Sequence, residues 1–582
     1  MRKLVETTTF VLIVQACIAV TAIAQQEANP PAIREDQVSA DVLNTKALIH
    51  KLDVLETELA ESLTAQREQA EAVRQMRKKL EAQEKEIQKL EANQSHFPPA
   101  ILESSSEPAG PDAAALRSAV KALKADDAAK PGQVLPPPPE LVGSYRGELY
   151  FRIGDVTLIP NGWMDFTGYF RSTNVGSGLG TNFQSIPYNN TVQGGQSEFR
   201  LTAQASRIGL RVDEIVGPLK AYGYVEADFN GYLPSNAYVS TNSDTLRMRV
   251  YYLNVAHDKW EVLAGQGWSL ITPTRKALSP FLADLFNTFH LDTSYQAGLI
   301  YARQPQLRFV YHPTESTALG LSIEEPEQYS GSAVTFPTLF SSTETDAGSS
   351  SGGGTSTPNI HPDVIAKATI DRYVHGLYWH AGVAGLLTPT RVYTPSSITK
   401  ADSVTDIREG GGAAVDFNLE LLRGFHLIGV GYWSDGGGRY LGGMGPGFVV
   451  LQNGTISSPF QAALIHSGSG IGGFEWMLTR RTTISTYYSS AYFQRRYGLD
   501  PDIKTPTYVG YGYPGSSNTN NRTIREASFA SITTLWQKSA YGALQFITQS
   551  SHVTRSPWYM APNSPKDAHT FMEFMSLRYV LP

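Results

Sequence analysis

Short segments that alternate apolar and polar side chains recur along the chain after residue 143. In residues 163–172, Met164, Phe166, Gly168 and Phe170 share one side, while Asp165 and Arg171 fall on the other. The same alternation recurs in residues 219–228 and 415–421, again with charged residues on the polar side. Successive side chains of a β-strand point to opposite faces, so each segment predicts a strand with one oily and one hydrated face. No convincing helical period interrupts residues 143–582, and an all-β region is predicted.

The connections between these segments alternate in length. Short turns at 257–259, 312–316 and 479–481 interleave with long Gly/Ser-rich stretches at 229–245, 326–361, 389–409 and 499–523. Short turns on one side and long loops on the other are typical of an outer-membrane β-barrel. Repeating units of about 25 to 30 residues accommodate roughly sixteen to eighteen strands, a size that encloses an aqueous channel. We predict a transmembrane barrel of sixteen antiparallel strands in residues 146–582. A water-soluble sandwich with a dry core is the alternative, because alternation alone does not separate the two.

A seven-residue repeat holds from Thr45 to Gln94 and predicts a coiled coil over residues 36–95. The apolar seam is formed by Leu48, Leu52, Leu55, Leu59, Val73, Met76, Leu80, Ile87 and Leu90. Polar seam residues Ser62, Gln66 and Gln69 lower the stability in exchange for a defined register or oligomer, so parallel self-association is expected. A single solvated helix braced by charge pairs is the alternative.

The N-terminus predicts export. Arg2 and Lys3 precede an apolar stretch, and Ala22-Ile23-Ala24 fits a cleavage site, so residues 1–24 are expected to be a signal peptide. Acylation of Cys17 in a lipoprotein-like box is the weaker alternative. A short tail (25–35) leads to the coiled coil. A Pro/Ala/Ser-rich linker (96–145) follows it.

Composition narrows the function. Cys17 is the one cysteine of the chain, so disulfide frameworks and cysteine metal sites are not expected. No apolar run of eighteen residues follows the N-terminus, so no transmembrane helix is expected in the mature chain. Neither a nucleophile with its base nor a metal-ligand spacing stands out. We therefore predict no catalytic residue, no metal site, no cofactor and no nucleic-acid partner.

Cationic and aromatic residues on the polar faces are candidates for guiding anions. Arg247 and Arg249 are two apart on one strand and are expected to stack along the pore wall, where guanidinium groups would bind carboxylates. The predicted pore-lining set is Arg171, Lys220, Tyr222, Tyr224, Arg247, Arg249, Tyr251 and Arg308. The alternative for each arginine is that it neutralises an inward acid such as Asp165, Glu226 or Asp228.

The segment after residue 269 is expected to narrow the pore. Residues 270–296 follow a predicted strand at the place where porins fold their third extracellular loop inward. The predicted constriction residues are Arg275, Lys276, Asp284 and Asp292. Basic and acidic walls facing each other would orient dipolar solutes.

Four segments carry a family resemblance: residues 161–172, 204–207, 263–269 and 438–441. In this order they resemble the DcaP-like outer-membrane porins, which also have a helical arm before the barrel. The resemblance implies a homotrimer of sixteen-stranded barrels with a three-stranded coiled coil in the periplasm. It further implies passage of small solutes with a preference for organic anions. Insertion by the barrel-assembly machinery is expected too, with Tyr579 in place of the usual terminal aromatic residue.

The predicted function is that of an outer-membrane porin for small hydrophilic solutes, embedded in outer-membrane lipid with its coiled coil in the periplasm. A structural anchor, whose coiled coil tethers the membrane to the cell wall, is the alternative. An adhesin role for the long loops is less favoured, because these loops are rich in Gly, Ser and Asn.

Overall fold

The computed structural model describes residues 150–231, 244–281, 284–286, 290–331, 333–340, 359–501, 507–538 and 541–582. All described residues belong to one unit of the chain, Ala119–Pro582. The predicted signal peptide, tail, coiled coil and linker, residues 1–24, 25–35, 36–95 and 96–145, lie outside the described residues.

Eighteen described strands form one antiparallel sheet that closes on itself. The first nine are β1 (Phe151–Ile153), β2 (Val156–Arg171), β3 (Glu198–Thr202), β4 (Arg207–Val216), β5 (Leu219–Asp228), β6 (Arg247–His257), β7 (Trp260–Trp268), β8 (Arg303–Thr314) and β9 (Thr317–Glu324). The other nine are β10 (Asp363–Val374), β11 (Leu377–Thr394), β12 (Val404–Leu422), β13 (Phe425–Asp435), β16 (His466–Met477), β17 (Thr482–Phe493), β20 (Asn521–Lys538), β21 (Gly542–Pro557) and β22 (Ala568–Val580).

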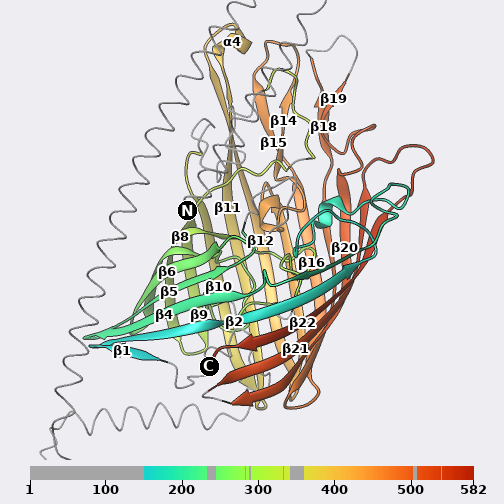
Figure 1. The fold of residues 1–582 in the computed structure, drawn as a ribbon. Coiled ribbons are helices and arrows are strands. Elements are labelled where there is room, and N and C mark those ends of the chain that lie inside the picture. Colours follow the sequence, from blue (N-terminus) through green and yellow to red (C-terminus); the bar gives the residue numbers. More distant parts are fainter. Residues whose placement is uncertain are drawn as a thin grey trace, which may run out of the picture. The chain divides into compact units, whose positions relative to one another are not determined.

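The eighteen strands occupy sixteen positions in the barrel wall. Strands β3 and β4 pair in turn with the same edge of β2 and together fill one position. Strand β1 is a short addition that pairs with the first residues of β2. Pairing of β2 with β22, from Trp163–Val580 to Arg171–Met572, closes the ring (Figure 1). The prediction of a sixteen-stranded antiparallel barrel is confirmed.

Strand β9 shows how the wall is oriented. Its apolar residues Leu319, Leu321 and Ile323 are 43–52% exposed, whereas Ser322 and Glu324, which point the other way, are at most 1% exposed. A soluble sandwich would bury the apolar face instead. The apolar face therefore forms the exterior of the barrel and the polar face its lumen, which excludes the sandwich alternative.

Aromatic residues frame this exterior. Trp260, Trp379 and Trp476 lie close to the short turns, and exposed Trp433 and Phe571 lie nearer the long loops. Such paired aromatic belts are typical of barrels that cross a membrane. An acidic side chain interrupts the exterior on β22, where Glu573 lies between outward Phe571 and Met575 and accepts a hydrogen bond from Ser550 Oγ at 2.7 Å.

The long connections gather at one end of the barrel and carry their own small elements (Figure 1). These are the 3₁₀ turns η2 (Phe183–Ser185) and η6 (Gly438–Tyr440), the helix α4 (Ser396–Thr399), and two hairpins, β14 (Phe448–Gln452) with β15 (Phe460–Leu464) and β18 (Arg496–Leu499) with β19 (Tyr508–Tyr511). Within the described ranges, no helix has the length and apolar character needed to span a membrane.

Candidate functional site

The lumen of the barrel is the candidate site, and the described part of the β7–β8 loop, residues 269–281, 284–286 and 290–302, lies inside it. The loop leaves the wall at Trp268 and reaches the opposite wall, formed by β16, β17, β20 and β21. Its apolar side chains, among them Leu270, Ile271, Phe286 and Ile300, are buried. The loop therefore acts as a packed insert rather than as a flexible rim.

The first half of the β7–β8 loop is held by side chains of β10, β11 and β16. Lys367 Nζ donates to Thr272 O at 2.8 Å, and Asp371 Oδ2 accepts from Ala277 N at 3.0 Å. Arg275, a predicted constriction residue, forms a bidentate pair with Glu475 at 2.5 and 2.6 Å. Both side chains are buried. The bidentate pair therefore anchors the loop, although burying it removes the hydration of two charges.

The second half is held by β17, β20 and β21. Gln549 Oε1 accepts from the N–H groups of Leu291 and Asp292 at 2.6 and 3.1 Å. Gln296 Nε2 donates to Ser489 Oγ at 2.9 Å, and Glu526 Oε2 accepts from Ala297 N at 2.7 Å. These wall groups satisfy backbone N–H groups of the loop that would otherwise be buried without partners.

The remaining predicted constriction residues take different places. Asp292 is buried, and its Oδ1 accepts from Thr181 N at 3.0 Å and from Ser294 N at 2.9 Å. Burial raises the pKa of the Asp292 carboxyl, an effect that nearby Arg171 opposes. Asp284 accepts from Ser279 Oγ at 2.6 Å, whereas Lys276 is exposed. Acidic and basic groups of the loop therefore do not face each other across an open gap.

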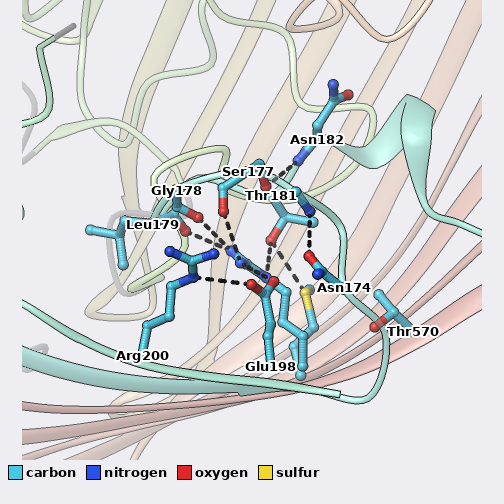
Figure 2. Close-up of polar contacts among 12 residues, drawn as sticks. Asn174, Ser177, Gly178, Leu179, Thr181, Asn182, Glu198, Arg200 and Thr570 are labelled. Carbon is cyan, nitrogen blue, oxygen red and sulfur yellow. Dashed lines mark hydrogen bonds and ion pairs between the residues drawn. The ribbon is translucent and has the colours of Figure 1, made fainter. Parts of the chain in front are cut away.

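The β2–β3 loop, residues 172–197, also folds inward, and Arg171 holds it. The fully buried guanidinium of Arg171 pairs with Glu198 at 2.9 Å and donates to the carbonyls of Gly178 and Leu179, both at 3.0 Å. Figure 2 shows Gly178, Leu179 and Thr181 gathered around this point and Asn182 directed away from it. Arg171, predicted to line the pore, instead anchors a loop.

Arg308, which was also predicted to line the pore, is likewise buried and contacts a loop. It is buried on β8 and donates to Gln306 Oε1 at 3.0 Å and to the carbonyl of Trp268, where the β7–β8 loop begins. Lys220 is exposed at the start of β5, close to the short turns. Tyr222 and Tyr224 face the lumen and pack against Phe281 of the β7–β8 loop, with ring centroids 5.4 and 5.7 Å apart.

A β-bulge corrects the expected face of Tyr251. Glu226 pairs with Val250 and Ala227 with Met248, so Arg249 is the extra residue on β6. The extra residue reverses the alternation after it, because each side-chain direction then shifts by one position. Tyr251 is accordingly 44% exposed on the exterior, and Tyr252 takes the lumen-facing place.

Four arginines near the long-loop ends of β4, β6 and β8 form an arginine cluster, comprising Arg207, Arg247, Arg249 and Arg303. Arg249 pairs with Glu226 and with Asp228, both at 2.7 Å. Arg247 pairs with Asp228 at 2.8 Å, and Arg207 with Glu226 at 3.4 Å. Three guanidinium groups thus pair with two carboxylates, and with Arg303 as the fourth cation the cluster has a formal surplus of two positive charges.

Arg303 was not among the predicted residues. It forms no ion pair with any carboxylate of the described residues. Its guanidinium lies 5.3 Å from the Trp268 ring centroid, and its Nη1 is buried without a described hydrogen-bond partner. Arg249 lies 5.9 Å from the same ring. The rings of Tyr295 and Tyr301 pack next to Trp268, with centroids 6.3 and 6.0 Å from its ring centroid. Cationic and aromatic groups are therefore interleaved on this side of the lumen.

Water reaches part of the lumen on the side of β4 to β8. The paired side chains of Arg211 and Asp213 are 35% and 34% exposed, and those of His312 and Glu261 are each 31% exposed. Elsewhere inward groups such as Lys367, His380 and Glu526 are at most 3% exposed. The described lumen is thus mostly filled by loops. The expectation that the inward polar faces of all strands line water is corrected.

A cavity of about 290 Å³ lies where four loops meet above the lumen. Its walls come from the β2–β3 loop, the β7–β8 loop, Tyr329 after β9, and residues 442–444 after η6. Among the residues that the structure describes, no group of three or more His, Cys, Asp or Glu side chains is placed to hold a metal ion.

Comparisons with known proteins agree with this architecture. No family model and no curated protein matches the chain. The outer membrane channel DcaP of Acinetobacter baumannii superposes with a TM-score of 0.51 and 16% identity, over 74% of this chain and 99% of the channel. An anion-selective porin from Comamonas acidovorans gives a TM-score of 0.40 and 10% identity, over 73% of this chain and 100% of the porin. The first likeness shows a common fold, so the resemblance to DcaP-like porins is confirmed at that level.

Proposed function

We propose that the chain is an outer-membrane channel for small hydrophilic solutes that favours organic anions such as carboxylates. A closed barrel with an apolar exterior satisfies the backbone polar groups of its strands within a bilayer, which supports membrane insertion. A polar lumen lowers the barrier for a solute by keeping it hydrated or hydrogen-bonded.

The observation that carries the anion preference is the arginine cluster. Its two carboxylates leave a formal surplus of two positive charges beside a partly hydrated stretch of wall. A guanidinium group matches a carboxylate in planar geometry and is charged at neutral pH. The Arg247 side chain is 34% exposed, and Arg303 forms no ion pair with a carboxylate of the described residues. An anionic solute would therefore bind at these two arginines.

Passage requires the β7–β8 loop to move away from at least one wall, because the loop fills the described lumen. On the side of β4 and β5 the loop contacts are aromatic stacking of Phe281 on Tyr222 and Tyr224. On the opposite wall the loop is held by the Arg275–Glu475 ion pair and by hydrogen bonds to β17, β20 and β21. We propose that release of the loop from this opposite wall opens the path for solutes.

The test is a planar bilayer recording of the purified protein under a salt gradient. We expect stepwise conductance and a reversal potential that indicates anion preference. Arg303→Gln combined with Arg247→Gln should shift the reversal potential toward zero. Lys276→Gln is the control, because it removes an exposed cation of the β7–β8 loop that lies outside the arginine cluster. Conductance with cation preference would refute the role of the cluster, and no conductance from a folded barrel would refute the channel.

The parts of the chain outside the described residues complete the proposal. We propose that residues 1–24 direct export and that the barrel-assembly machinery inserts the barrel. Residues 36–95 are proposed to form a three-stranded periplasmic coiled coil that joins three barrels. The mass of the detergent-solubilised protein, measured by light scattering, should correspond to three chains, and a single-chain mass would refute the trimer.

A further inference from the structure

The cavity above the lumen lacks ionisable acids and bases, in contrast to the arginine cluster beneath it. Its lining consists of amide, hydroxyl and aromatic side chains with several glycines, including Asn182, Gln184, Ser294, Phe183, Tyr301 and Tyr329. A charged solute would lose hydration here without gaining a counter-charge, which is unfavourable. The cavity is therefore built for an uncharged solute.

Two glycines keep this cavity open. Gly442 and Gly443 have φ of +64° and +72°, a region that other residues rarely adopt. A Cβ at Gly442 would lie 3.1 Å from the Tyr301 ring, and one at Gly443 would lie 3.1 Å from the Tyr329 hydroxyl. Side chains at these positions would therefore press on the two rings and fill the space between them. Their absence leaves ring surface available to a solute.

Hydrogen-bonding side chains of the β2–β3 and β7–β8 loops line the same space. The Asn182 backbone N–H donates to Ser177 Oγ at 3.3 Å, but its side chain has no described partner and points away from the Arg171 contacts (Figure 2). Ser294 uses its backbone groups toward Asp292 and Tyr301, and its hydroxyl has no described hydrogen bond. The Gln184 side chain lies within hydrogen-bonding range of Tyr329. Amide and hydroxyl groups of this kind both donate and accept, as a polyhydroxylated solute requires.

We infer that this cavity is an entry site for uncharged, hydroxylated solutes of monosaccharide size, the sugar class. Its volume of about 290 Å³ lies just below the usual range of about 300–1,000 Å³ for small-molecule sites, as expected for a small solute. Aromatic rings supply an apolar surface with a polar edge, which suits the alternating C–H and O–H faces of a sugar ring. The inference rests on the proposed channel function and names a second solute class for it.

Tyr301 connects the cavity with the path below. Its ring lines the cavity and lies 5.4 Å from Tyr295 and 6.0 Å from Trp268, the ring beneath Arg303. A solute leaving the cavity would meet these aromatic faces before the cationic groups. Uncharged solutes thus have a site at the entrance that does not use the arginine cluster.

The experiment measures interruption of the ion current by glucose added to the long-loop side in symmetric salt. We expect glucose to block the current in a concentration-dependent manner, and the double variant Asn182→Ala/Gln184→Ala to weaken this block at least tenfold. Asn189→Ala is the matched control, because it removes an exposed amide of the same loop that does not line the cavity. The anion preference of the double variant should equal that of the unaltered protein, since the arginine cluster is intact.

The outcomes separate the inference from the proposed function. Anion-selective current without glucose block, or block that the double variant leaves unchanged, would overturn the sugar site while the channel stands. If no current is found, the channel fails, and calorimetric titration of the purified full chain with glucose decides the site. Heat of binding that the double variant loses would support it, and no heat would overturn it.

Discussion

Replacing Arg275 by methionine tests whether ion pairing with the wall holds the β7–β8 loop in the lumen. With the loop inside, the variant leaves Glu475 fully buried with the Tyr487 hydroxyl as its described side-chain partner. Breaking a buried pair from one side costs about 3–5 kcal/mol, and the Tyr487 bond places the cost near the low end, about 3 kcal/mol. With the loop displaced, water would hydrate Glu475, so the cost falls on the loop-in state.

Because this cost falls on the loop-in state, it should increase the fraction of channels with the loop displaced. Because about 1.4 kcal/mol is a tenfold change in an equilibrium, the ratio of loop-in to loop-out molecules should fall roughly 100-fold. Single-channel recordings should show a correspondingly larger fraction of time in the high-conductance state. The barrel itself should remain folded, since its strand pairing does not involve Arg275.

Two further variants control for indirect effects. Lys276→Met changes the exposed neighbour and should leave the opening statistics unchanged. Arg275→Met combined with Glu475→Leu removes both charges and should return the channel toward the closed state, because no unpaired carboxylate remains. The reasoning is refuted if Arg275→Met forms a folded barrel whose opening statistics match those of the unaltered protein.

Three other outcomes follow from the same contacts. Gln549→Ala removes the acceptor for two buried N–H groups, and leaving each one unsatisfied costs about 1–3 kcal/mol. Channel opening should therefore increase at least tenfold in single-channel recordings. Equal opening would show that Gln549 does not hold residues 291–292. Because the pKa of Asp292 is raised, its carboxyl binds a proton more tightly with the loop inside than in water, so acidification toward that pKa should favour the loop-in state and lower the conductance. Asp292→Asn should abolish this pH-dependent loss of conductance. Conductance that rises on acidification would contradict the reasoning. Glu573→Leu removes a carboxylate from the apolar exterior and should raise the free energy of unfolding in lipid by about 1–2 kcal/mol, measured by urea titration; a decrease together with loss of the oligomer would show that a neighbouring copy covers this face.

The barrel was predictable because its signal is local and repeated. Each strand such as β9 alternates large apolar residues with small or polar ones, and the turn lengths alternate with it. Neither feature depends on knowing which strands are neighbours. The length limited the strand count to roughly sixteen to eighteen, since each unit of strand and loop uses a similar number of residues.

The lumen was less predictable because its contacts join distant parts of the chain. Arg275 and Glu475 are 200 residues apart, and nothing near either one marks the other as its partner. The face of Tyr251 depends on a single extra residue in β6, which the alternation does not reveal. Arg303 lies at the first position of β8, out of phase with inward Gln304, Gln306 and Arg308, and its contact with Trp268 arises only once the strands are paired.

The most direct test locks the β7–β8 loop to the wall. A Cβ at Gly298 would lie 3.0 Å from Ser469 Cβ, somewhat closer than the separation of about 3.5–4.5 Å in a disulfide, and Gly298 has a φ of +82°, so the loop backbone must shift slightly to accommodate the two cysteines. In a Cys17→Ser background, Gly298→Cys/Ser469→Cys should therefore cross-link on oxidation and release on reduction. The proposed channel predicts no conductance steps while the disulfide is intact and anion-selective steps after reductant is added. Equal conductance in both states, with the cross-link confirmed by mass spectrometry, would contradict passage of solutes by displacement of this loop.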